Sequence, residues 1–335
     1  MLKWCINLNV RTADDMKHYF IVNPAAGKGK DPKTLIARIE EICRKRKTDF
    51  EIYVTKKAGD ATDFVRKKCE SAAEKLRFFS CGGDGTNNEI ISGAIGHSNA
   101  EVGFVPDGTG NDFIKCFNAA ENFSDIEAQL DSTASPIDII SCNDKYIMNI
   151  MNIGFDCEVV RRTGKIKRLP LISKSMAYIL GVVVELIRKP GTTMTVSIDG
   201  GEKSRKELLL ATFSNGRYYG GGFNASPKAR LRDGLMDVCL VSNIPRVKFI
   251  KLIKDYRAGT YLDKPQFRSI VEFYRCKKAR IEFDRDHSVC IDGELFEGRV
   301  FDIKLLSGAL NILIPKGSSF AKDEGIVAET AFANC

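Results

Sequence analysis

The stretch LRFFSCGGDGTNNEIISGAI, residues 76–95, joins an apolar segment, a glycine-rich turn and a helix-like segment. Residues 76–80 predict a strand, the GGDGT turn follows at 82–86, and residues 87–95 predict a helix. Glycine has no Cβ and tolerates positive φ, so backbone N–H groups in such a turn can surround an anion. The stretch therefore predicts an α/β domain with a phosphate-binding loop after a strand.

Two further glycine-bearing turns lie on either side of this stretch. The NPAAGKG loop, residues 23–29, follows a strand-like segment at 18–23 and precedes an amphipathic segment at 32–46. The GTGNDF run, residues 108–113, follows a strand-like segment at 101–105. One such turn alone is more often a tight connection, but three in order indicate a phosphate pocket at the carboxyl ends of parallel strands. Within it, the carboxylate of Asp84 can engage the Mg²⁺ that a nucleoside triphosphate carries.

Composition limits the classes of partner. The 335 residues are 44% hydrophobic, which suffices for two domains, and Lys and Arg number 51 against 43 Asp and Glu, a formal charge of +8. This charge favours nucleotides, nucleic acid or an anionic membrane surface as partners. The sequence has no aromatic-rich basic patch of the kind that reads nucleic acid, so a nucleic-acid partner is not expected.

Cysteine usage and hydropathy bear on the location. The eleven cysteines occur without a C-x-x-C pair, which is typical of reduced thiols in the cytosol. Residues 1–17 lack the apolar core of a secretory signal, and no uncharged run reaches transmembrane length. We expect a cytoplasmic protein, with peripheral contact to the inner membrane face as a further option.

The pattern of the chain changes near residue 141. Residues 18–140 alternate strand-like and helix-like segments, including a strand at 50–55 and a helix at 59–73, which predicts a mostly parallel sheet. Residues 141–307 predict a largely antiparallel β domain, with strands at 145–155, 192–198, 207–214, 235–242, 267–273, 279–283 and 299–305. Asp199-Gly200 is a hairpin signal. Residues 1–17 are expected to form a leader and 318–335 a tail.

Two helices are predicted within the β domain, at 173–187 and 245–257. The first is strongly apolar, holds Lys174 and Glu185, and is flanked by Lys and Arg on both sides, whereas the second is a shorter amphipathic basic helix. Packing against the sheet is the favoured interpretation, and docking on anionic lipid is the alternative.

Two acidic loops also lie in the β domain. Asp292-Gly293 alone predicts a type I′ turn. The loop at 229–237 holds Asp233, whose carboxylate and neighbouring carbonyl oxygens could surround a hard cation. Phosphoryl transfer needs a metal, backbone donors and a carboxylate that receives a proton. Since the glycine turns come from one domain and the acidic loops from the other, we expect the reaction in a cleft between them.

The ordered motifs resemble the diacylglycerol kinase catalytic family, which includes bacterial soluble lipid kinases and is related to sphingosine and ceramide kinases. The resemblance spans residues 18–316, with matches at 23–29, 54–61, 82–89, 108–113, 233–235 and 292–294. GGDGT alone is less specific, since NAD kinases and phosphofructokinases carry similar runs. The family fold implies an α/β nucleotide-binding domain, a β-rich lipid-substrate and metal domain, and a C-terminal strand at 308–316 that returns to the first domain.

The resemblance also implies roles for individual residues. Those that would line the ATP site are Asn23, Pro24, Ala25, Ala26, Gly27, Thr55, Gly82, Gly83, Asp84, Gly85, Thr86, Asn87, Asn88, Glu89, Thr109 and Asp112. Glu294 would be the general base for the lipid hydroxyl, with Asp84 and Asp292 as further catalytic residues. A second Mg²⁺ would bind the Asp233 carboxylate and the main-chain oxygens of Arg230 and Leu235. Lys115 stands where many relatives have arginine, so a bidentate contact would become a point charge.

The leading hypothesis is an ATP- and Mg²⁺-dependent lipid kinase that converts membrane-borne diacylglycerol to phosphatidic acid. Other lipids remain alternatives: a sphingoid base, ceramide or a phosphatidylglycerol-like lipid. An NAD kinase is more remote, because the GTGNDF run and Asp292 to Glu294 argue against it. A nucleotide-binding regulator or membrane adaptor would predict loss of the acidic residues, which are present. A homodimer is left open.

Overall fold

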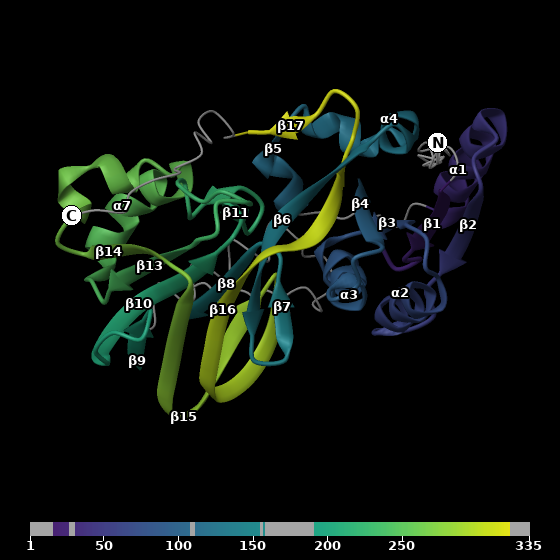
Figure 1. Ribbon diagram of the computed structural model, residues 1–335. Coiled ribbons are helices and arrows are strands. Elements are labelled where there is room, and N and C mark those ends of the chain that lie inside the picture. Colours follow the sequence, from purple (N-terminus) through teal and green to yellow (C-terminus); the bar gives the residue numbers. More distant parts are fainter. Residues whose placement is uncertain (1–15, 27–30, 108–110, 155–156, 158–190, 322–335) are drawn as a thin grey trace, which may run out of the picture. The chain divides into compact units, whose positions relative to one another are not determined.

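The structure is a computed structural model that describes residues 16–26, 31–107, 111–154, 157 and 191–321 (Figure 1). The helix expected at 173–187 and the expected leader up to residue 15 lie outside these residues. The chain forms two compact units. Unit 1 comprises residues 1–109, 121–137 and 309–316, and unit 2 comprises residues 110–120, 138–308 and 317–335.

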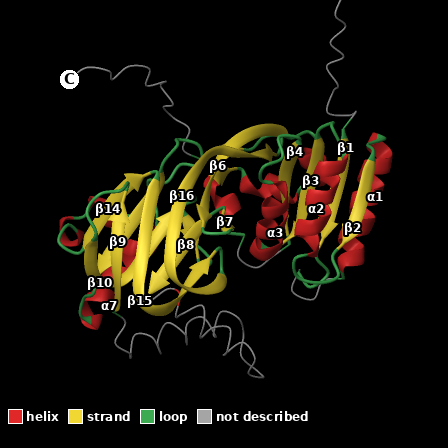
Figure 2. Ribbon diagram, turned by 60° about the horizontal axis from the view of Figure 1, so that its bottom comes forward, coloured by secondary structure: helices red, strands yellow, loops and turns green. Residues whose placement is uncertain are grey.

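Unit 1 contains the expected parallel sheet. Its strands are β1 (Lys17–Val22), β2 (Phe50–Val54), β3 (Leu76–Gly82) and β4 (Ala100–Pro106), in the order β2-β1-β3-β4. The last residues of β16 (Glu294–Ile314) add a parallel strand beside β4, where Asn311 pairs with Glu101. The helices are α1 (Pro32–Arg46), α2 (Asp60–Ser71), α3 (Asp84–Ala94) and α4 (Ile126–Leu130), and Figure 2 shows α1, α2 and α3 beside the strands.

Helices pack on both faces of this sheet. Phe20 of β1 and Phe79 of β3 stack and join a core that includes Ile39 of α1 and Ile126 of α4. Neighbouring residues on β1 and β3 point the other way, because successive side chains of a strand alternate. On that face α2 and α3 approach so closely that a Cβ on Gly93 would lie 2.5 Å from a backbone oxygen.

Unit 2 is built on antiparallel strands in the order β14-β13-β10-β8-β15-β16, and β9 pairs with β10 and β15. Their bounds are β8 (Ile150–Gly154), β9 (Thr192–Ile198), β10 (Ser204–Ser214), β13 (Met236–Ser242), β14 (Val271–Cys276) and β15 (Lys278–Ile291). The hairpin between β9 and β10 turns at Asp199 and Gly200, with φ of 47° and 76°. The short strands of this unit are β5 (Phe117–Asn118), β7 (Lys145–Ile147), β11 (Tyr218–Tyr219), β12 (Phe223–Asn224) and β17 (Ser319–Phe320). The ten-residue strand β6 (Thr133–Cys142) pairs with β16 and β7, and its residues 133–137 belong to unit 1.

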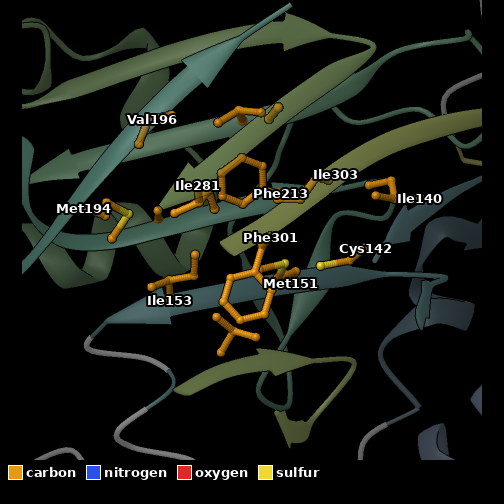
Figure 3. Close-up of a cluster of buried hydrophobic side chains, with 14 of the residues drawn as sticks. Ile140, Cys142, Met151, Ile153, Met194, Val196, Phe213, Ile281, Phe301 and Ile303 are labelled. Carbon is orange, nitrogen blue, oxygen red and sulfur yellow. The ribbon is translucent and has the colours of Figure 1, made fainter. Parts of the chain in front are cut away.

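Two buried clusters use alternate residues of the same strands. Figure 3 shows one cluster, in which Met151, Phe213 and Phe301 are enclosed by aliphatic side chains. The other cluster lies under α7 (Arg246–Ala258) and contains Phe249 and Tyr256. No helix within the described ranges is long and apolar enough to cross a membrane. The predicted fold class, an α/β domain followed by an antiparallel β domain, is confirmed.

Several predicted bounds differ from the structure. Helix α3 begins at Asp84 rather than at residue 87, because most of the GGDGT turn forms the first helical turn. The strand expected at 145–155 is divided into β7 and β8 by contacts of residues 148–150 described below. The strand expected at 267–273 begins at Val271, since Pro265–Phe267 forms a 3₁₀ helix.

The beginning of the expected tail is part of the fold. Ser319 and Phe320 form β17, which pairs antiparallel with β5. The ring of Phe320 lies 5.2 Å from the ring of Phe117. Aromatic packing and a short ladder therefore hold this segment to unit 2.

Candidate active site

Three predicted motifs lie together at the carboxyl ends of the strands of unit 1. They are the NPAAGKG loop after β1, the segment that begins at Thr55 after β2, and the GGDGT turn after β3. The N–H of Asn23, after β1, donates to the carbonyl of Cys81 in β3 over 3.1 Å. The N–H of Thr55, after β2, donates to the carbonyl of Val22 over 2.9 Å. Ligands of parallel sheets bind at this edge because the loops that follow the strands gather there.

A side-chain bond joins the NPAAGKG loop to the GGDGT turn. Asn23 Nδ2 donates to Thr86 Oγ1 over 2.9 Å, and Asn23 Oδ1 accepts from the N–H of Ala25 over 2.9 Å. The Thr86 side chain leaves no room for a side chain at position 82, because a Cβ on Gly82 would lie 2.5 Å from Thr86 Oγ1. The two motifs therefore form one structural element at the sheet edge.

The N-terminus of α3 presents backbone donors at the same edge. Its N-cap is Gly83, which supplies no side-chain acceptor for the first turn, and Asp84 is the first helical residue. Such N–H groups and the positive end of the helix dipole favour a bound anion. Ser80 Oγ donates to Asn87 Oδ1 over 2.6 Å and fixes this turn to β3. The arrangement can hold a phosphate group next to the Asp84 carboxylate.

The neighbouring acidic residues position the helices around this edge. Glu89 of α3 accepts from the N–H of Ala61 through Oε2 over 3.2 Å, which joins α3 to the start of α2. Asp60 accepts from the Tyr53 hydroxyl over 2.9 Å and from the N–H of Lys56 over 2.8 Å. These two hydrogen bonds lower the pKa of Asp60. Direct nucleotide contacts of Glu89 remain a prediction.

Two of the expected ATP-site residues, Gly27 and Thr109, lie outside the described residues. Asp112, at the end of the GTGNDF run, belongs to unit 2 and is buried. Its Oδ1 lies 2.5 Å from Lys115 Nζ, and its Oδ2 accepts from the N–H of Gly221 over 2.9 Å. Asp112 therefore fixes the glycine loop at 220–222, a link that the sequence analysis did not predict.

Asp292 anchors the turn that carries Glu294. The turn joins β15 to β16, with φ of 46° at Asp292 and 94° at Gly293, as a type I′ turn requires. The Asp292 carboxylate accepts backbone N–H bonds from residues 148, 149 and 150 at 2.8, 3.0 and 2.9 Å. Glu294 is the first residue of β16 and is exposed. In this structure Asp292 positions the turn that carries Glu294.

The guanidinium of Arg275 lies at the predicted second metal site, beside Asp233. The Asp233 carboxylate contacts the Arg275 guanidinium, and Arg275 Nε also donates to Asp237 Oδ1 over 3.2 Å. Asp233 Oδ1 further accepts from the N–H of Leu235 over 3.1 Å. Burial raises the pKa of Asp237 to about 6. In the part of the chain that the structure describes, no group of three or more His, Cys, Asp or Glu side chains lies close enough together to hold a metal ion.

The arrangement at Asp233 therefore does not fit a second Mg²⁺ as it stands. Carboxylate and carbonyl oxygens suit Mg²⁺, but the guanidinium already neutralises the carboxylate. A metal ion held by Asp233 and the main-chain oxygens of Arg230 and Leu235 would have to displace Arg275.

A buried aspartate outside the predicted site organises the same region. Asp138 is 2% exposed, and its carboxylate accepts from the N–H of Gly234 over 2.7 Å and the N–H of Gly308 over 2.9 Å. Ser307 Oγ donates to it over 3.1 Å. Asp138 therefore fixes the loop of Asp233 to β16 within unit 2. Its one sequence signal is an isolated acid in the apolar run PIDII.

Two family models match the chain, one after the other. Residues 17–142 match the diacylglycerol kinase catalytic domain. Residues 149–314 match the YegS C-terminal NAD kinase beta sandwich-like domain. The two matches follow the same order as the α/β and β-rich parts of the chain.

Individual proteins are similar over most of the chain. A protein named "Probable lipid kinase YegS-like" from Alcanivorax borkumensis is 26% identical over 280 residues, which cover 80% of this chain and 88% of the relative. The "Diacylglycerol kinase" of Mycobacterium tuberculosis is 26% identical over 303 residues, covering 88% and 94%. A crystal structure of a diacylglycerol kinase from Bacillus anthracis has a TM-score of 0.63 at 23% identity and covers 88% of this chain and 96% of its own, which shows the shared fold.

Proposed function

The chain belongs to the diacylglycerol kinase catalytic family and is a lipid kinase, and from this premise we propose that it transfers the γ-phosphoryl group of Mg²⁺-bound ATP to a hydroxyl of diacylglycerol. The observation that carries the proposal is the bond between Asn23 and Thr86, which unites two glycine-rich motifs at the N-terminus of α3. A pocket of backbone donors at a helix N-terminus suits a chain of phosphates.

Unit 1 has the role of binding the nucleotide in this proposal. The N–H groups of the first turn of α3 donate hydrogen bonds to the phosphate oxygens, and Asp84 engages the Mg²⁺ that accompanies ATP. The metal reduces the negative charge on the phosphates, so that an incoming oxygen meets less repulsion. The segment around Thr55 and the NPAAGKG loop complete the site.

Unit 2 has the role of activating the lipid hydroxyl. The Glu294 carboxylate takes the hydroxyl proton while the hydroxyl oxygen forms a bond to the γ-phosphorus. The bond between that phosphorus and the bridging oxygen breaks, and ADP leaves with the bonding electron pair. Support for this role comes from the exposure of Glu294 and from the three backbone bonds that hold Asp292 two residues away.

Diacylglycerol is the proposed substrate because a relative of matching length bears the name diacylglycerol kinase. A sphingoid base, ceramide and a phosphatidylglycerol-like lipid are the competing acceptors. Each is borne by a membrane, so the proposal places the protein in the cytoplasm in peripheral contact with the inner membrane face. The formal charge of +8 supports contact with an anionic surface.

A panel of acceptors tests this function. Purified protein is incubated with Mg²⁺ and ATP labelled at the γ-phosphate, together with vesicles of each lipid or with NAD. We expect label in phosphatidic acid, and no label when Mg²⁺ is chelated. Labelling of NAD, or of none of the lipids, would refute the proposal, and labelling of another lipid would replace diacylglycerol as the substrate.

A further inference from the structure

The two most exposed large hydrophobic side chains of the described residues lie on one helix of unit 2. Val247 is 67% exposed and Ile250 is 55% exposed, and both belong to α7. Residues three apart in a helix are neighbours on its surface, so the two side chains form one apolar patch. Isolated exposed aliphatic residues are common, but a pair on one helical face is a candidate contact surface.

Lysines border this patch. Lys251 and Lys254 are exposed and share the face of Val247 and Ile250, because 3.6 residues complete a turn. The one acidic residue of α7, Asp255, is partly buried and pairs with Lys264 at 2.6 Å. The outer face of α7, defined here as Val247, Ile250, Lys251 and Lys254, therefore combines aliphatic and cationic groups without an opposing carboxylate.

The opposite face of α7 fixes the helix to unit 2. Phe249 and Tyr256 are buried against the sheet, and the ring of Tyr256 lies 5.2 Å from that of Tyr261. The helix ends at Gly259, whose φ of 73° provides a left-handed cap. Figure 1 shows α7 beside β13 and β14. The packing interpretation of this helix is correct for its inner face, and it leaves the outer face without a role.

We propose that the outer face of α7 docks on an anionic lipid bilayer. The lysines meet the headgroups, while Val247 and Ile250 enter the interface between headgroups and acyl chains. A bilayer suits this face better than a protein does, because lysine is depleted in protein interfaces and aromatic anchors are enriched there. The inference rests on the proposed function, since a lipid kinase must reach a substrate that stays in the membrane.

Vesicle flotation tests the docking surface on the full chain. The vesicles are phosphatidylcholine alone or phosphatidylcholine with about one third phosphatidylglycerol. We expect binding to the anionic vesicles, reduced by salt, and a drop of roughly 20-fold or more in K251Q/K254Q, since each lysine contributes about 5-fold near such a surface. V247S/I250S should reduce binding at all salt concentrations. The control K67Q/K304Q removes the same charge from exposed positions elsewhere and should bind as the wild type does.

The readouts separate this inference from the proposed function. Activity is measured in parallel on diacylglycerol in anionic vesicles and on a short-chain diacylglycerol dispersed in solution. The inference predicts that the α7 variants lose activity on vesicles only, with unfolding temperatures close to that of the wild type. Wild-type flotation by either α7 variant, or capture of a second copy of the chain instead of vesicles, would overturn the docking surface. Flotation that depends on α7 in a protein inactive on both substrates would refute the proposed function alone.

Discussion

Asn23 and Thr86 are 63 residues apart in sequence, yet Asn23 Nδ2 donates to Thr86 Oγ1 over 2.9 Å. The bond links the loop after β1 to the first turn of α3. The same asparagine holds its own loop through the N–H of Ala25. One side chain therefore fixes both walls of the proposed phosphate pocket.

Replacing Asn23 should weaken nucleotide binding more than folding. N23A removes two hydrogen bonds of about 1 kcal/mol each, so we expect a rise of roughly 10- to 30-fold in the dissociation constant for Mg²⁺-ATP, measured by calorimetry. Asn99 offers a matched control, because its Nδ2 donates to the carbonyl of Ala72 over 2.8 Å. This bond does not involve the glycine-rich loops. N99A should lower stability and leave the affinity unchanged. Equal affinities of N23A and wild type would remove Asn23 from the site.

Asp292 should affect turnover through the position of Glu294. In D292N an amide replaces one oxygen that accepts backbone N–H bonds, so we expect lower kcat and a loss of about 2 kcal/mol in the free energy of unfolding. Asp199 is the control: it also has positive φ in a turn of unit 2 and accepts the N–H of Lys277 and Lys278. D199N should lose stability with kcat retained. A kcat for D292N equal to that of D199N would contradict the positioning role.

Arg275 should make the stability of unit 2 independent of Mg²⁺. Since the guanidinium contacts both Asp233 and Asp237, R275Q leaves a buried carboxylate without its partner and should cost about 2–3 kcal/mol. We expect wild-type unfolding temperatures to be the same with EDTA or Mg²⁺ when nucleotide is absent, and those of R275Q to rise with Mg²⁺. R280Q, which breaks surface pairs, is the control. A Mg²⁺-dependent rise in the wild type would favour the second metal ion at Asp233.

His18 should make folding sensitive to mild acid. Burial lowers the pKa of this ring to about 4, and the ring stacks on Phe79 at 5.7 Å. In the unfolded chain His18 binds a proton with its ordinary pKa of 6.5, whereas in the folded chain the ring stays neutral until the pH approaches 4. The free energy of unfolding therefore falls as the pH drops from 6.5 toward 4. The contribution is roughly 3 kcal/mol. Asp237 acts in the opposite sense, because its raised pKa makes the fold gain stability as the pH drops below about 6. The effect of His18 must therefore be measured as a difference between the wild type and a variant without this histidine.

The H18F variant isolates that difference. Phenylalanine keeps the stacking but does not titrate. Denaturant unfolding of both proteins at pH 7 and pH 4.5 should show a larger loss for the wild type. Parallel losses would mean that His18 is not the acid-sensitive group.

Local sequence predicted many elements well. The bounds expected for α1 agree with the structure because Asp31 caps the helix and Pro32 opens it. The start of α3 was missed, since Gly83 and Gly85 have low helix propensity and here serve the N-terminal turn. The loop at 82–89 and the turn at 292–294 could be identified by their motifs.

Long-range partners could not be predicted in the same way. The contact of Asp138 with Gly308 spans 170 residues, and that of Arg275 with Asp233 spans 42. No local pattern specifies either partner, because both contacts depend on how the strands of unit 2 are ordered. The sequence therefore indicated that Asp233 could bind a cation, but not that the guanidinium of Arg275 lies beside it.

The most direct test of the central claim is the turnover of E294Q on diacylglycerol vesicles, with Mg²⁺-ATP binding measured on the same sample. The control E297Q changes an exposed glutamate three residues along the same strand. If Glu294 receives the hydroxyl proton, kcat of E294Q falls by about 10²-fold or more while nucleotide affinity and the activity of E297Q are retained. A kcat for E294Q within a factor of about two of the E297Q value would contradict the account.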